Sequence, residues 1–274
     1  MLNGLYVTEP NTLIIPSGAP DLLDSEFWGI CEIDGLGRPD AATYTADKVG
    51  SDASFWSGLS VKSRKITLSV DAQSDIYKMQ LYKALGYGDK RRMFFETDAG
   101  IFWIDGYVTG MKYTSDASAI SEFEIPIFCP YPWFRSAKYH EKAITYGGDA
   151  VSVSQNGDVR AGVGLYLPST STGNLNYLKV SSAPDGYAIK YESSEYQHIM
   201  GIANQPILLI DTTPGNHAFL ASKMVQDIAI TKDWCTVPAT GAVNISAQIG
   251  IWSGLNYIET ANGLIRWHDT WSGI

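Results

Sequence analysis

Alternating apolar and polar residues predict β-strands along most of the chain. In the segment 64–70, Ile66, Leu68 and Val70 share one face, and lysine, threonine and serine occupy the other. A period of two is typical of a strand that packs one face against a core. The segment 122–129 alternates in the same way, so we expect a β-sheet at the centre of the first half of the chain.

Turn and breaker residues mark the ends of some of these strands. The segments 93–97 and 101–107 flank a short turn that ends in Gly100, which predicts a hairpin. Pro126 has no N–H group to donate to a ladder, so its strand is expected at a sheet edge or at a bulge.

One amphipathic helix is predicted over residues 75–85. Ser74 or Asp71 can cap its N-terminus, and Gly86 suits a left-handed residue after its C-terminus. The helix has an apolar stripe that consists of Tyr77, Leu81, Ala84 and Leu85. This stripe could form a groove for a partner, but packing against the sheets is the expected role.

The periodic pattern breaks down between residues 36 and 62, where small and polar residues dominate. Loops longer than about 12–15 residues without structure of their own are usually functional or disordered. One interpretation is a projecting arm that docks its aromatic residues Tyr44, Phe55 and Trp56 on a neighbouring subunit. The other is a plain long hairpin with a buried tryptophan.

A domain boundary is predicted near residue 137. Pro130 and Pro132 end the preceding strand, and the polar segment 138–149 is expected to be a linker. Short strands separated by turns then continue to the last residue, which predicts a β-sandwich. The expected fold class is therefore mainly β: an α+β domain over residues 1–137 and a sandwich over residues 150–274.

Within the sandwich, one hairpin is predicted from local sequence. The apolar segments 151–153 and 163–167 flank Asn156-Gly157, a dipeptide that favours a tight turn.

Composition and charge restrict the function. Charged residues make up 18% of the 274 residues and aromatic residues 12%, which favours broad contacts between subunits. The net charge of -9 argues against wrapping DNA or coating an anionic membrane, because both need a basic face. No secretory signal is expected at the start, and the three cysteines are expected to stay reduced.

Motifs for catalysis or cofactor binding are absent from the sequence. It has no nucleophile elbow, phosphate loop or zinc signature, and its histidines lack ligand spacing. We therefore expect no enzyme, no cofactor and no metal site. Aromatic residues near the C-terminus could stack on sugars or fill the core, and packing is the expected role. They are Trp252, Tyr257, Trp267, His268 and Trp271.

An ordered set of segments, none specific alone, spans nearly the whole chain. The set consists of residues 28–36, 63–68, 75–85, 92–95, 102–108, 123–134, 151–158, 209–212 and 253–258. In this order the segments resemble the distal tail proteins of long-tailed, non-contractile bacteriophages. The N-terminal half carries most of the likeness, through Arg-x-Ile-x-Leu at 64–68 and Pro-Tyr-Pro-Trp-Phe at 130–134.

The resemblance implies a structural virion protein. Such proteins form a homo-hexameric ring at the far end of the tail tube. The ring joins the tail tube protein to the tail-associated or fibre protein. The ring anchors receptor-binding proteins, and its lumen passes the tape-measure protein and then DNA without specific binding. Its N-terminal domains form the ring and its galectin-like sandwiches project outward. The implied location is the tail tip of the virion, after assembly in the host cytoplasm.

The alternative is a monomeric, lectin-like protein that binds carbohydrate through the C-terminal sandwich. The two hypotheses differ in solution mass, because a ring is several-fold heavier than a monomer. The acidity of the chain suits the ring, since an acidic channel repels phosphate during DNA passage.

Overall fold

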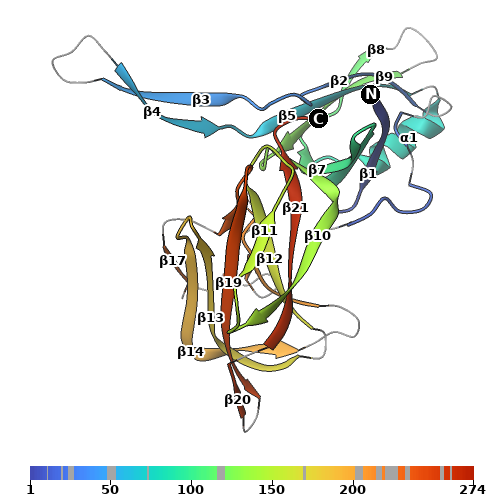
Figure 1. Ribbon diagram of the computed structural model, residues 1–274. Coiled ribbons are helices and arrows are strands. Elements are labelled where there is room, and N and C mark those ends of the chain that lie inside the picture. The colour runs from blue at the N-terminus through green and yellow to red at the C-terminus, as the bar shows by residue number, and fades with distance from the viewer. Residues whose placement is uncertain are drawn as a thin grey trace. The chain divides into compact units, whose positions relative to one another are not determined.

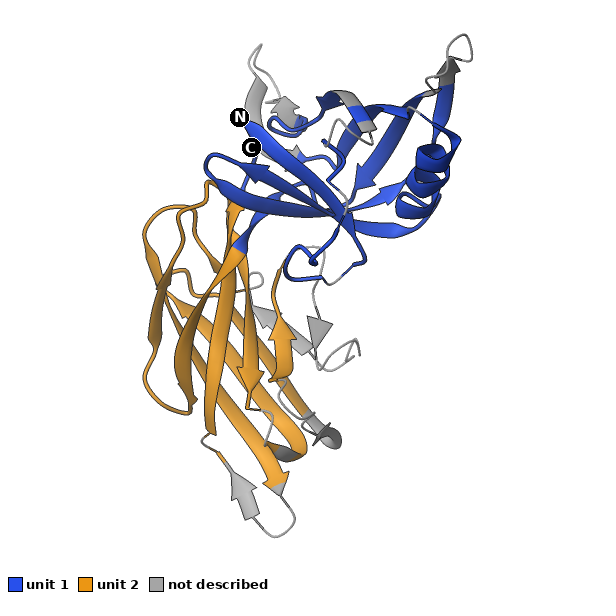
Figure 2. Cartoon of the chain, turned by 90° about the vertical axis from the view of Figure 1, so that its right-hand side faces the viewer, with its two compact units in different colours: residues 1–137, 271–274 blue, residues 138–270 orange. Residues whose placement is uncertain are grey.

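The chain divides into two compact units, which Figure 2 shows in blue and orange. The first unit comprises Met1–Ala137 together with Trp271–Ile274, and the second comprises Lys138–Thr270. The fold is described from a computed structural model. The structure describes residues 1–10, 12–19, 21–23, 28–47, 54–72, 74–115, 121–168, 171–200, 206–213, 218–219, 228–231, 235–253, 256–259 and 261–274.

Antiparallel strands in the order β1-β6-β7-β9-β5-β2 form the first unit, and β8 pairs with β9 (Figure 1). Apolar residues on alternate positions of these strands meet in one core, which confirms the predicted alternation. The hairpin between β6 and β7 is also confirmed, because Thr97 pairs with Gly100. The strands are β1 (Leu2–Thr8), β2 (Trp28–Asp34), β5 (Arg64–Ala72), β6 (Lys90–Thr97), β7 (Gly100–Val108), β8 (Lys112–Ser115) and β9 (Ser121–Cys129).

The predicted helix is α1 (Asp75–Ala84), which is the one α-helix within the described part of the chain. Ser74 caps it by accepting a hydrogen bond from the N–H of Tyr77, and Leu81 is fully buried. The apolar stripe therefore packs on the core, as predicted. The prediction of a left-handed conformation at Gly86 was wrong. Helix α1 ends at Leu85 with a negative φ, and the glycine with positive φ after the helix is Gly88.

The segment 36–62 contains a hairpin of its own. Strands β3 (Ala41–Asp47) and β4 (Ser54–Val61) form a two-stranded sheet, drawn in blue in Figure 1. Among the described residues, neither strand pairs with any other strand. The side chains of Tyr44, Phe55 and Trp56 lie outside the described part, so their predicted docking stays a prediction.

The second unit is a β-sandwich, as expected. One sheet has the order β16-β15-β12-β21-β10, with β18 on β12, and the other has the order β11-β19-β13-β14-β17, with β20 on β19. Apolar residues of both sheets share one core. The strands are β10 (Phe134–Tyr146), β11 (Val151–Ser154), β12 (Ala161–Leu167), β13 (Thr172–Ala183), β14 (Ala188–Met200), β15 (Ile207–Asp211), β16 (Ala218–Phe219), β17 (Ile228–Thr231), β18 (Thr236–Val237), β19 (Ala242–Ser253), β20 (Asn256–Ile258) and β21 (Ala261–Trp271).

The polar segment 138–149 differs from its expected role as a linker. Most of it belongs to β10, which runs to Tyr146 beside β21. Two of its charged residues have partners on neighbouring strands: Glu141 accepts a hydrogen bond from Arg266 on β21 at 2.6 Å, and Lys142 donates to the carbonyl of Ser152 on β11 at 2.7 Å. Polarity here reflects cross-strand ion pairs on a solvated sheet face rather than a break in the structure.

Two local predictions were also wrong. The segments 151–153 and 163–167 form no hairpin, because β11 and β12 belong to opposite sheets of the sandwich. Gly157 is needed there for another reason: a Cβ atom would lie 2.1 Å from the backbone oxygen of Thr270. For Pro126 only the edge alternative was wrong: β9 has β5 on one side and β7 and β8 on the other, and Pro126 lies opposite the interruption between β7 and β8.

Within the described part of the chain, no helix combines the length and the apolar character that crossing a membrane requires.

Candidate functional site: the hairpin base and the acidic sheet face

The β3–β4 hairpin closes at its base through backbone bonds. The N–H of Lys62 donates to the carbonyl of Asp40 at 2.9 Å. Just before the hairpin, Gly35 has a φ of 89°, and a Cβ atom there would lie 2.2 Å from the carbonyl oxygen of Lys65. Only glycine fits this close approach, so the chain enters and leaves the hairpin along a fixed path.

A buried guanidinium holds this base together. The Nε atom of Arg64 donates to the carbonyl of Pro132 at 2.7 Å, and Nη2 donates to the carbonyl of Ser272 at 2.6 Å. The Nη1 atom donates to the carbonyls of Gly35 and Gly37. Four backbone carbonyls from three distant segments therefore converge on one side chain.

Arg64 is 2% exposed and lies over the ring of Phe134, with its Cζ atom 4.5 Å from the ring centroid. Burial lowers the pKa of the guanidinium from its ordinary value. An arginine nevertheless stays protonated in proteins, so a positive charge sits in the interior. Carbonyl dipoles and the ring face stabilise that charge, and its loss would leave buried acceptors without donors.

The last residues of the chain complete the hairpin base. The N–H of Ile274 donates to the carbonyl of Leu36 at 3.2 Å. Gly273 lies so close to the entry segment that a Cβ atom would be 3.1 Å from the carbonyl carbon of Gly37. The ring of Trp271 meets Phe102 edge-on at 6.2 Å. The path into the hairpin therefore depends on residues at the far end of the sequence.

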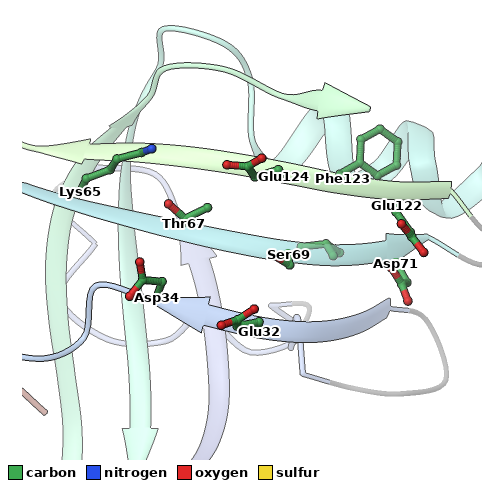
Figure 3. A pocket seen from close by; sticks show the side chains of 10 residues that line it. Glu32, Asp34, Lys65, Thr67, Ser69, Asp71, Glu122, Phe123 and Glu124 are labelled. Atoms are coloured by element: carbon green, nitrogen blue, oxygen red, sulfur yellow. The ribbon is translucent and has the colours of Figure 1, made fainter. Parts of the chain in front are cut away.

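An acidic groove of about 610 Å³ follows the outer face of β2, β5 and β9, and Figure 3 shows its side chains. The alternate residues of β5 point into the core, so these polar side chains face outward. Five carboxylates and a single amine line the groove, which gives this sheet face a strongly negative character. The charged residues are Glu32, Asp34, Asp71, Glu122 and Glu124, with Lys65 as the cation.

The described residues contain no cluster of side chains suited to hold a metal ion. The five carboxylates of the groove outnumber its one amine, so the electrostatic field at this face repels phosphate and other anions and attracts cations.

Of the aromatic residues near the C-terminus whose side chains are described, two pack in the cores. Trp267 is buried in the sandwich core, and its Nε1 atom donates to the carbonyl of Ser154 at 2.9 Å. Trp271 packs in the first unit, and the side chain of Tyr257 lies outside the described part. Trp252 stays partly exposed. Packing, the expected role, accounts for the two tryptophans on β21.

The sequence interpretation missed the role of Arg64. The alternation along the strand could have revealed it. Arg64 lies on the same face of β5 as Ile66, Leu68 and Val70, so its side chain is directed toward the core. A charged residue on the buried face of a strand indicates a polar anchor. The part played by Ser272 had no such signal, because it depends on the return of the chain terminus.

Comparison with known proteins identifies the class of fold. No family model matches the sequence, and no curated protein matches it. The fold, however, is shared with proteins of phage adsorption machinery along the whole chain.

One solved structure with this fold is the SPP1 Dit (gp 19.1) protein, described as a paradigm of the hub adsorption apparatus in phages that infect Gram-positive bacteria. It matches with a TM-score of 0.58 and 10% identity over 98% of this chain and 99% of that chain. A chain of the phage P2 baseplate in its activated conformation with Ca matches with a TM-score of 0.54 and 10% identity over 99% of both chains. At this identity the likeness establishes a common fold.

Proposed function

We propose that the protein is a structural component of a phage tail tip whose first unit forms a hexameric ring. The observation that carries this proposal is the likeness to a hub adsorption protein over nearly the full length of both chains. Both units are included, so the likeness extends to the domain organisation. The protein acts by assembly, without catalysis and without a cofactor.

The acidic groove on β2, β5 and β9 supports a channel. In a ring, this outward face of the sheet lines the lumen, while its opposite face packs on the core. Carboxylates along the wall repel the phosphates of DNA, so DNA passes without being held. The tape-measure protein occupies the same lumen before DNA enters.

The β3–β4 hairpin supports contact between subunits. A two-stranded ribbon is marginally stable in water, and this hairpin pairs with no other described strand. Its aromatic residues Tyr44, Phe55 and Trp56 contact the next subunit. The ring then joins the tail tube protein to the tail-associated or fibre protein and to receptor-binding proteins at the virion tail tip, after assembly in the host cytoplasm.

Solution mass tests the ring directly. We expect light scattering with the full chain to show monomers of 30.0 kDa at low concentration and hexamers at high concentration. Few dimers should appear, because a head-to-tail ring gains most of its stability on closure. A chain that stays monomeric at every concentration, or that forms only dimers, would contradict the proposal.

A further inference from the structure

One buried arginine of the first unit has no acceptor for its charged donors among the described residues. Arg64, Arg91 and Arg92 each donate to backbone carbonyls or to carboxylates. Arg135 is 8% exposed, yet within the described part of the chain its side chain forms no hydrogen bond and no ion pair. A buried charge is costly unless it is paired and hydrogen-bonded, so Arg135 calls for a partner that these residues do not supply.

The guanidinium of Arg135 lies over two aromatic rings. Its Cζ atom is 4.6 Å from the ring centroid of Trp103 and 4.4 Å from that of Tyr131. The Nε atom is buried without a partner, whereas the two Nη atoms, which no described residue binds, are not buried. These two Nη atoms therefore form the open edge of an otherwise enclosed cation. The rings stabilise the charge without neutralising it.

Asp105, whose carboxylate interacts with the charge of Arg135, is already bound by other cations. Arg92 donates to Asp105 at 2.6 and 3.0 Å, and the Nζ atom of Lys90 lies 3.4 Å from Oδ2 of Asp105. The guanidinium of Arg92 also lies over Trp103, with its Cζ atom 3.7 Å from the ring centroid. Three cations thus share one carboxylate, so this cluster has a net positive charge and attracts an anion.

The second unit contains a similar arrangement with its acceptor in place. Arg266 lies over the rings of Tyr139 and Tyr166, with its Cζ atom 5.0 Å from each centroid. Its Nε atom donates to Glu141 at 2.6 Å. Arg135 has the two rings but lacks the carboxylate. A carboxylate also matches the open edge of Arg135, because two parallel N–H groups pair with its two oxygens.

We propose that Arg135 binds a carboxylate group that comes from outside the chain. The carboxylate accepts hydrogen bonds from the two Nη atoms, and the charges of Arg92 and Lys90 add attraction. Its source is either a small carboxylate ion or the side chain of an aspartate or glutamate on another protein. This site goes beyond the proposed ring and does not depend on it.

Protection by acetate tests the site in the full chain. Cys129 is buried in the first unit, so its thiol should react with a thiol reagent only when that unit opens. A ligand of the folded state slows this reaction by a factor of one plus the ratio of ligand concentration to Kd. For a Kd on the order of 10 mM, about 100 mM acetate should slow labelling about tenfold relative to chloride at equal ionic strength.

Three arginine variants separate binding from folding. Arg135→Met removes a buried charge without a partner, so in chloride it should fold at least as well as the wild type, but it should lose the protection by acetate. Arg135→Lys keeps the charge without the paired donors and should retain about twofold protection or less. Arg266→Met is the matched control: its carboxylate lies within the chain, so the variant should keep the full protection of Cys129.

Two further probes identify the ligand. Phosphate at the same ionic strength should protect less than acetate, because one guanidinium edge satisfies a carboxylate better than a phosphate dianion. An acetylated Gly-Glu-Gly amide, with the Gly-Gln-Gly amide as its control, presents a carboxylate on a peptide. Stronger protection by the glutamate peptide than by acetate assigns the site to a protein side chain, and the reverse assigns it to a small ion; both results support a carboxylate site.

Two results would overturn the proposal. Labelling of Cys129 that acetate does not slow, or slows equally in the wild type and in Arg135→Met, removes Arg135 as the binding residue. Stronger protection by phosphate than by acetate shows that the ligand is not a carboxylate.

Discussion

The two units differ in what they leave exposed to water. Within the described residues, ten of the twelve exposed large hydrophobic side chains belong to the first unit. The second unit contributes only Tyr139 and Trp252 to this set. Both units have a closed core, so the difference does not reflect incomplete folding. Among the described residues, exposed apolar surface is therefore concentrated on the first unit.

The units also differ in what they bury. All four buried arginines of the described residues lie in the first unit, while the buried polar residues of the second unit are neutral. Arg92 shows the pattern: it binds Asp105 through two hydrogen bonds, at 2.6 and 3.0 Å, and stacks on Trp103 at 3.7 Å. In the second unit, the buried side chain of Gln155 binds backbone groups instead: its Nε2 atom donates to the carbonyl of Val159, and its Oε1 atom accepts from the N–H of Thr270. Ion pairs that involve a buried arginine should therefore contribute to the stability of the first unit, whereas the ion pairs described in the second unit are more exposed.

Each unit carries a natural reporter of its own unfolding. Burial raises the pKa of the Cys129 thiol to about 12 and that of the Cys235 thiol to about 11. Both cysteines are buried and reduced, so neither should react with a thiol reagent near pH 8 until its unit opens. Labelling at Cys129 reads the first unit, and labelling at Cys235 reads the second.

The largest expected effect follows from removing the buried guanidinium. Arg64→Met leaves four carbonyls without their donor and should lower the free energy of unfolding of the first unit by about 3–5 kcal/mol. Labelling of Cys129 should accelerate while that of Cys235 does not change. Arg160→Met is the control, because Arg160 forms a partly exposed ion pair and should cost less than about 1 kcal/mol. Equal effects of the two variants would refute the role of Arg64.

Leu81→Ala tests the core stripe of α1. The variant removes a fully buried side chain and should cost about 2–5 kcal/mol through lost transfer energy and a cavity. Met79→Ala, on the exposed face, should change the free energy of unfolding by less than about 0.5 kcal/mol. Thermal unfolding followed by circular dichroism measures both. A melting curve unchanged by Leu81→Ala would mean that the stripe does not pack on the core.

Deletion of residues 272–274 tests the contribution of the chain terminus. It removes the carbonyl that Arg64 Nη2 binds and the bond from Ile274 to Leu36, which should cost about 1–3 kcal/mol. Hydrogen exchange should accelerate at Lys62, whose N–H closes the hairpin base. Exchange in the sandwich strands should not change. Unaltered exchange at Lys62 would show that the terminus does not support the hairpin.

The smallest effect is expected from acid. Burial by itself would raise the pKa of Asp105, but the hydrogen bonds and charge of Arg92 hold that pKa below its ordinary value of 3.8. The stabilisation from Asp105 is therefore complete above about pH 4 and is lost as the pH falls below 3.8 toward the folded-state pKa. Urea unfolding of Asp105→Asn should show a weaker dependence on pH in this range than the wild type. Parallel curves for the two proteins would contradict the assignment.

Sequence patterns predicted the local elements well where one face of an element is apolar. The alternation in β5 and β9 and the stripe of α1 each specify a buried face without reference to the rest of the chain. Pro126 shows where this reasoning fails. It lies in a central strand of the sheet, opposite the interruption between the end of β7 and the start of β8. Its carbonyl accepts a hydrogen bond from the N–H of Thr109 there, and no strand residue on that side needs an N–H donor from position 126. A central strand can hold a proline at such a gap, and that gap is invisible in sequence.

The sequence by itself determined the strands, the helix, the two-part organisation and the acidic character, because these depend on residue type and on short-range periodicity. The tertiary structure decided how distant segments meet: that β11 and β12 take opposite sheets, that β10 continues through a polar segment, and that Ser272 returns to Arg64. Such contacts join residues far apart in the chain, and their free energy depends on geometry that no local pattern encodes. For the same reason the enclosed guanidinium of Arg135 became visible only in the folded chain, where it lies over Trp103 and Tyr131.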